Sequence, residues 1–100
     1  MNDTSNPSTA EKLSRVYTIV NQRGLHARAS AKFVQLVDSF DAKVTVEKDG
    51  VTVGGTSIMG LMMLAASPGC SIHVSAEGHD AVQLLNALEE LIVNKFGEEC

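Results

Sequence analysis

Asn21-Gln22-Arg23-Gly24-Leu25-His26-Ala27-Arg28-Ala29-Ser30 connects a predicted strand to a predicted helix. The strand covers residues 14–20, where Tyr17 and Ile19 share one face. The helix covers residues 27–39, because apolar side chains recur there at helical spacing. His26 is therefore expected at the start of a helix.

A histidine at a helix start can bring chemistry to an anion. The first turn presents unpaired backbone N–H groups, here those of Ala27 and Arg28, and the positive end of the helix dipole. The guanidinium of Arg28 adds a fixed charge whose fork matches phosphate oxygens. These residues indicate a histidine that accepts a phosphoryl group. The alternative, since nothing in the spacing identifies phosphate, is a surface histidine or a weak helix cap.

The composition describes one ordinary domain. The 100 residues are 44% hydrophobic and 20% charged, enough for a single modest core. The net charge of -4 argues against general binding to nucleic acid or to anionic membranes, which both need a basic surface. We find no apolar run of membrane-spanning length and no secretory signal. We therefore expect a cytoplasmic protein that does not bind membranes.

Cysteine and histidine spacing favours neither a disulfide nor a metal site. Cys70 lies in a strand pattern and Cys100 is the last residue, so we expect no structural disulfide. His26, His73 and His79 lack tight ligand spacing with cysteine, which weakens the hypothesis of a small metal-binding domain. We predict neither a metal nor a cofactor, and we interpret His73 and His79 as structural residues.

Further strands and helices follow the first pair. Alternating apolar residues predict strands over 42–47, 51–53 and 70–76, and Lys48-Asp49-Gly50 supplies turn chemistry for a hairpin. A helical stripe covers residues 81–96. The order is strand, helix, strand, strand, helix, strand, helix. Because each strand has one wet face, this order predicts an α+β open-faced, two-layer sandwich with helices on one face of the sheet.

The two ends of the chain are predicted to lie outside the domain. Residues 1–13 are polar and predict a flexible N-terminal tail, and residues 98–100 predict a short C-terminal tail. The domain itself is expected over residues 14–97.

A short helix is predicted after Thr56 or Ser57, either of which can act as its N-cap. It is apolar on nearly every side, with Ile58, Met59, Leu61, Met62, Met63 and Leu64. A short helix cannot bury all of these side chains, and an exposed apolar patch commonly marks a partner site. Methionine suits such a surface because its shape adapts. The alternative is that all six belong to the core.

The chain resembles the HPr family, the histidine-containing phosphocarriers of the bacterial phosphotransferase system. Three segments carry the resemblance: Gly24-Leu25-His26-Ala27-Arg28, Thr56-Ser57-Ile58-Met59-Gly60 and Ile72-His73-Val74-Ser75-Ala76-Glu77-Gly78. The resemblance covers about residues 14–96 and implies a four-stranded antiparallel sheet of order 1-4-2-3 with three helices. One departure is Ala29, where many relatives have proline.

The resemblance also implies roles for individual residues. His26 matches the histidine that is phosphorylated on Nδ1, and Arg28 matches the arginine that assists transfer. Ser57 matches a serine that some bacteria phosphorylate for regulation, which would involve an HPr kinase/phosphorylase. Ser57 can equally be a simple helix cap. Ile58, Met59 and Met62 match an apolar patch that contacts partner proteins.

The function expected from this resemblance is a phosphoryl relay. Enzyme I, charged by phosphoenolpyruvate, donates to His26, and an EIIA-type protein takes the group. Such a protein is a phosphohistidine carrier rather than a stand-alone catalyst, and we expect a monomer. The alternative is a regulatory phosphoprotein of the nitrogen-related branch, which acts through phosphorylation-dependent protein binding.

Overall fold

The computed structural model describes residues 12–99. Within that range the elements follow the order β1 (Lys12–Thr18), α1 (Ala27–Asp38), β2 (Lys43–Lys48), β3 (Val51–Gly54), α2 (Ile58–Met63), β4 (Ser71–Glu77) and α3 (Ala81–Val93), then a short 3₁₀ turn over Lys95–Gly97. This order confirms the predicted alternation of strands and helices.

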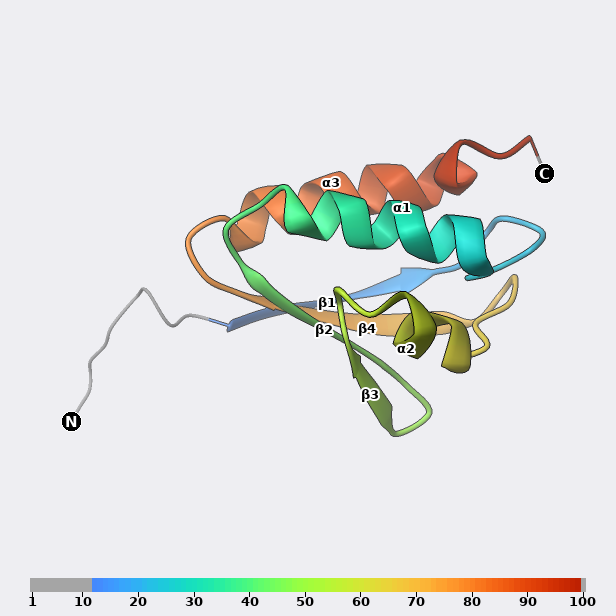
Figure 1. Ribbon diagram of the computed structural model, residues 1–100, viewed down its shortest axis with the longest axis horizontal. Helices are drawn as coiled ribbons and strands as arrows, with labels where there is room; N and C mark the ends of the chain where they lie inside the picture. Colours follow the sequence, from blue (N-terminus) through green and yellow to red (C-terminus); the bar gives the residue numbers. More distant parts are fainter. Residues whose placement is uncertain (1–11, 100) are drawn as a thin grey trace.

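The four strands form one sheet in the order β1-β4-β2-β3. Every neighbouring pair is antiparallel, and β4 lies in the middle between β1 and β2. α1 and α3 lie side by side above one face of the sheet (Figure 1), and α2 packs against α1 and β3. The structure confirms the open-faced α+β sandwich, including the strand order that only the family resemblance implied.

The core lies between the sheet and the helices, as strand alternation predicts. On β4, Ile72, Val74 and Ala76 are fully buried, whereas Ser71 and His73 face solvent. Fully buried residues from the helices complete this layer: Ala29 and Phe33 from α1, Leu61 from α2, and Leu84, Leu85 and Leu88 from α3. Burial of these side chains holds the helices on the sheet, and each valine, leucine, isoleucine or phenylalanine among them contributes about 1.5–3 kcal/mol when fully removed from water.

β1 begins two residues earlier than predicted. Lys12 and Leu13 pair with Glu77 and Ala76 of β4, so they belong to the sheet rather than to a tail. The strand also ends earlier, at Thr18, although Ile19 N–H still donates to the Cys70 carbonyl at 2.9 Å. The predicted N-terminal tail otherwise lies outside the described residues.

The β2–β3 hairpin follows the turn chemistry of its sequence. Lys48 pairs with Val51, which leaves Asp49 and Gly50 as a two-residue loop. Both have positive φ, 52° and 84°, as a type I′ turn requires. The Gly50 N–H also donates to Oε2 of Glu47 at 2.9 Å.

The C-terminal helix is shorter than predicted. α3 ends at Val93, and Lys95 and Phe96 then adopt left-handed φ values of 58° and 56°. Phe96 is only 1% exposed, so the reversal carries its ring into the core, whereas a continued helix was the prediction. Lys32 of α1 donates from Nζ to the Phe96 carbonyl at 2.7 Å and ties this turn to α1.

Candidate functional site

The loop before α1 is held against the loop between α2 and β4. Leu25 N–H donates to the Ala66 carbonyl at 3.0 Å. Gly24 has φ of 64°, and a Cβ added there would lie 2.2 Å from the Ala66 oxygen. Only glycine fits such an approach without moving the backbone. This contact positions the residues that lead into the helix.

His26 is the N-cap residue of α1. Its backbone is extended, with φ −74° and ψ −178°, and its side chain makes no capping hydrogen bond. The first bond within the helix joins Ser30 N–H to the His26 carbonyl at 2.8 Å. The N–H groups of Ala27 and Arg28 precede that bond, and both residues are exposed. The structure thus has the open helix start that the sequence predicted.

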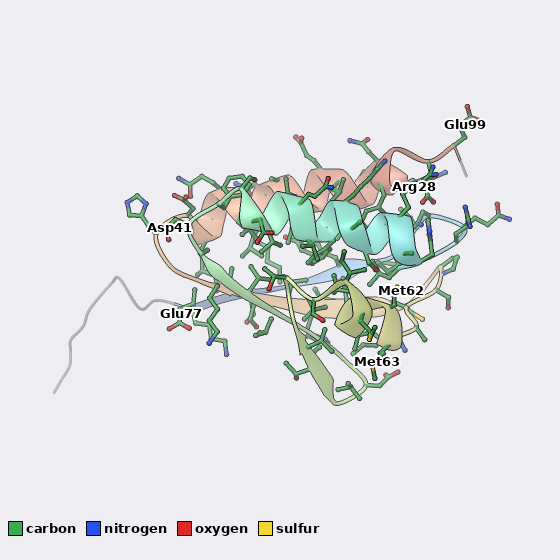
Figure 2. All side chains as sticks on the ribbon, viewed as in Figure 1. Arg28, Asp41, Met62, Met63, Glu77 and Glu99 are labelled. Carbon is green, nitrogen blue, oxygen red and sulfur yellow. The ribbon has the colours of Figure 1, made fainter. Side chains whose placement is uncertain are left out.

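The guanidinium of Arg28 is available at this end of the molecule. It forms no ion pair within residues 12–99, unlike Arg15, which lies 3.6 Å from Glu89. Figure 2 shows Arg28 at the same end of the molecule as Glu99, with Asp41 and Glu77 at the opposite end. A free guanidinium beside an open helix start favours a phosphate-sized anion.

The ring of His26 is more covered than the sequence suggested. Its side chain is 19% exposed, and Nε2 pairs with Oε2 of Glu98, whose own side chain is 15% exposed. None of the hydrogen bonds within residues 12–99 involves Nδ1. Glu98, which the sequence placed in a C-terminal tail, therefore forms part of the site and leaves Nδ1 as the unengaged nitrogen.

The second oxygen of Glu98 is held by Asn21. Asn21 Nδ2 donates to Oε1 of Glu98 at 3.0 Å and to the Gly24 carbonyl at 2.9 Å. Burial raises the pKa of the Glu98 carboxyl, but the hydrogen bonds from Asn21 and then His26 outweigh it, and the pKa lies below its ordinary value. The ionised carboxylate is therefore the form that faces the ring.

Ser57 and α2 present the other predicted site residues. Ser57 is the N-cap of α2, and its hydroxyl accepts from Gly60 N–H at 2.9 Å. Leu61 is buried on the inner side of the helix, whereas four other apolar residues of the helix are exposed, which confirms the prediction that some of them stay on the surface. An apolar hollow is lined by Ile58, Met59, Met62 and Met63, which are 40%, 73%, 43% and 74% exposed.

The other histidines lie elsewhere. His73 is exposed on β4, with Nδ1 3.8 Å from Oε1 of Glu47. His79 is exposed before α3 and lies 3.1 Å from Asp80. Within residues 12–99, no group of three or more His, Cys, Asp or Glu residues could hold a metal ion. Among the three histidines, His26 is thus the one that lies at a helix start beside an arginine with no ion pair in the described part of the chain.

A family model described as the PTS HPr component phosphorylation site matches residues 13–94. The chain belongs to the HPr family. It is 46% identical over 86 residues to the phosphocarrier protein HPr of Cupriavidus necator, covering 86% of this chain and 97% of that protein. HPr proteins are phosphocarriers of the phosphotransferase system, and membership implies partners from that system in general.

Solved HPr structures share the architecture. HPr-C-His from Thermoanaerobacter tengcongensis superposes with a TM-score of 0.83 at 44% identity, covering 88% of this chain and 99% of that chain. An HPr dimer from the same organism superposes with a TM-score of 0.69 at 40% identity, covering 98% of this chain and 100% of that chain. Within residues 12–99 of this chain, no helix is both long and apolar enough to cross a membrane.

Sequence reasoning did not find Asn21, Glu98 or Met63. Asn21 lies in the loop before α1, but its amide contacts Glu98 only because the C-terminal turn brings Glu98 back to that loop. Glu98 is 72 residues from His26 along the chain, and no local pattern signals that contact. Met63 belongs to the short apolar helix. That helix has more apolar residues than it can bury, and this surplus was a signal that some of them, such as Met63, would be exposed.

Proposed function

We propose that this protein accepts a phosphoryl group on Nδ1 of His26 from phosphoenolpyruvate-charged Enzyme I and passes it to EIIA-type proteins. The observation that carries the proposal is the placement of His26 at the open N-terminus of α1, with Nε2 engaged and Nδ1 unengaged. Such transfer asks a protein mainly for positioning and charge stabilisation.

The surroundings of His26 supply that stabilisation. Backbone N–H groups of Ala27 and Arg28 and the positive end of the helix dipole favour the incoming negative charge. The Arg28 guanidinium can contact the phosphoryl oxygens directly. His26 and Arg28 are therefore proposed as the residues that carry the transfer.

The hollow on α2 is proposed as the docking surface for both donor and acceptor. Ile58, Met59 and Met62, together with Met63, expose apolar side chains on a helix that packs against α1. Ser57 lies at the start of that helix and is proposed as a regulatory phosphorylation site for an HPr kinase/phosphorylase.

We also propose that the protein is a cytoplasmic monomer, with its domain ending close to Gly97.

The proposal is tested by incubating the protein with Enzyme I and phosphoenolpyruvate. We expect acid-labile label on the wild type and none on His26→Ala, while His73→Ala, which removes an exposed histidine, keeps it. Label on His26→Ala at the wild-type level would refute the assignment.

The EIIA-type protein that accepts the phosphoryl group decides between the sugar relay and the nitrogen-related branch of the family. Labelled protein is mixed with sugar-type and nitrogen-type EIIA proteins, and the loss of label is followed in time. Rapid transfer to a sugar-type EIIA supports the sugar relay. Transfer only to the nitrogen-type protein supports the alternative of a regulatory phosphoprotein.

A further inference from the structure

The amide of Asn21 is oriented for donation only. Asn21 is fully buried, and Nδ2 makes both of its hydrogen bonds, to the Gly24 carbonyl and to Glu98. Oδ1 has no partner within the described residues. A flipped amide would set Oδ1 against two acceptor oxygens, so the observed orientation is required.

Glu98 reaches His26 because the C-terminal turn is anchored. The ring of Phe96 is buried, and Lys32 holds its carbonyl at 2.7 Å. This turn brings the Glu98 carboxylate between Asn21 and His26, with one oxygen for each. A carboxylate accepts hydrogen bonds and donates none, so the nitrogen of His26 that faces it must carry the proton.

We propose that Glu98, held by Asn21, is a positioning residue that keeps the proton of His26 on Nε2 and so leaves the lone pair of Nδ1 free to attack phosphorus. The inference rests on the proposed function and names residues that the family motifs quoted above do not include. The tautomer of a histidine is set by the partner of its other nitrogen, and in serine proteases the wrong tautomer strongly suppresses catalysis.

The transfer step balances with this assignment. The Nδ1 lone pair forms the new bond to phosphorus, while the bond between phosphorus and the donor breaks and its electron pair leaves with the donor. The ring keeps its proton on Nε2 and becomes positively charged. The Glu98 carboxylate faces that proton and stabilises the charge. In the onward transfer the electron pair returns to Nδ1 and the ring becomes neutral again.

Replacing Glu98 with glutamine separates this role from simple packing. Glutamine has nearly the same shape but only one acceptor oxygen. Asn21 must donate, so that oxygen faces Asn21 and the new NH₂ group faces His26. Nε2 then has to accept, which moves the ring proton to Nδ1. Glu98→Ala removes the acceptor without supplying a donor, so the proton position then follows only the intrinsic preference of the ring.

The proton position is measured directly by ¹⁵N NMR of the ring nitrogens in the unphosphorylated protein, at a pH where the ring is neutral. We expect the wild type to carry the proton on Nε2 and Glu98→Gln to carry it mainly on Nδ1. Glu99→Gln is the matched control, because it removes the same charge from the exposed neighbouring residue. It should keep the wild-type spectrum.

Transfer from Enzyme I is then timed for the same four proteins. We expect Glu98→Gln to be about tenfold or more slower than the wild type, a loss typical of a charge-assisted hydrogen bond. Glu98→Ala should be slowed less than Glu98→Gln, and Glu99→Gln should match the wild type. A purely structural role predicts the reverse order, since alanine removes more contacts than glutamine.

The outcomes distinguish the inference from the proposed function. If the wild type takes no phosphoryl group, the proposed function fails, while the NMR spectra still decide where the proton lies. If the wild type is phosphorylated but Glu98→Gln keeps its proton on Nε2 or transfers at the wild-type rate, the positioning role is overturned. Should glutamine disturb folding, Glu98→Ala remains decisive, because a wild-type transfer rate in that variant also overturns the proposal.

Discussion

At the scale of the residue, the site depends on a few side chains with clearly separated tasks. His26 offers Nδ1, Glu98 engages Nε2, and Arg28 has no ion pair within the described residues. A cation that already had a carboxylate partner would gain little from an arriving phosphate. The free guanidinium of Arg28 is therefore expected to matter for chemistry more than for folding.

Arg28→Ala should slow phosphoryl transfer by roughly 10- to 100-fold, the value of a lost charge-assisted hydrogen bond of about 1.5–3 kcal/mol. Its melting temperature should barely change, because the residue is exposed. Arg28→Lys should recover only part of the rate, since a point charge lacks the fork. The rates are read from single-turnover labelling by Enzyme I.

Lys43→Ala is the control for Arg28, since it also removes one exposed positive charge. Lys43 lies on β2 and pairs with Glu77, at the end of the molecule away from Arg28 (Figure 2). Normal transfer by Arg28→Ala would remove arginine from the mechanism.

At the scale of the element, α2 combines a capped start with an apolar outer side. The helix has six residues, and its Ser57 cap supplies one of the few hydrogen bonds that hold its first turn. An isolated helix of this length is not stable in water, so packing of Leu61 on the core keeps it formed. The exposed side is then free for partners.

Met59→Glu should weaken binding to Enzyme I and to EIIA proteins by about tenfold or more, because a charge would have to lose its water at an apolar contact. Unfolding should remain cooperative, since Met59 is 73% exposed. Val93→Glu is the control, as it places the same charge on a residue of α3 that is 64% exposed. Calorimetric titration measures both, and equal affinities for the two variants would contradict the docking surface.

Ser57→Asp should slow transfer from Enzyme I without lowering the melting temperature. An aspartate at this position can still accept from Gly60 N–H, and its charge is favoured at the start of a helix. The affinity for the partner should fall, because the docking protein meets a new charge beside Ile58 and Met59. A true phosphate adds about −1.5 to −2 charge and should act more strongly.

Ser57→Ala separates the cap from the switch. It should lower the free energy of unfolding by about 1 kcal/mol through loss of the capping bond, with transfer little changed. If Ser57→Asp instead slows transfer only together with a large fall in melting temperature, the effect is that of a damaged cap. Unchanged transfer in Ser57→Asp would leave Ser57 as a cap alone.

At the scale of the whole molecule, two distant loops are joined by Asp80 at the end away from His26. Asp41 N–H donates to Oδ2 of Asp80 at 2.8 Å, and Asp80 N–H donates to the Asp41 carbonyl at 2.9 Å. The bond from Asp41, and next that from His79, holds the pKa of Asp80 below its ordinary value of 3.8, against a smaller effect of burial. This reciprocal pair connects the loop after α1 to the start of α3.

Because the pKa of Asp80 is depressed by folding, its contribution to stability is present above about pH 4 and is lost as the pH falls through the folded value. Asp80→Asn should therefore be less stable than the wild type at pH 7 and lose less stability on acidification to pH 3. Urea unfolding at both pH values measures this. Asp38→Asn removes the same charge from the exposed end of α1 and serves as the control. Equal acid sensitivity of Asp80→Asn and the wild type would show that the bond to Asp41 is not linked to folding.

Most elements could be predicted because their signals are local. Ile72, Val74 and Ala76 alternate with polar residues, Asp49 and Gly50 suit a tight hairpin, and Ser57 precedes an apolar helix. Each of these patterns depends on neighbours within a few residues, and the structure confirms each. The end of α3 was wrong because Phe96 continues the helical spacing, and only its burial through a left-handed turn shows that the helix has stopped.

The sequence by itself determined the layered α+β class, the helix start at His26, the fixed positive charge of Arg28 and the apolar surplus on α2. Those properties follow from periodicity and residue chemistry, which act over one or two turns of chain. The tertiary structure alone decided that Asn21 and Glu98 join His26, and that Met63 is exposed beside Met59 and Met62. Such contacts depend on how the C-terminal turn and α2 pack on α1, and packing brings together residues far apart in sequence that no local pattern relates.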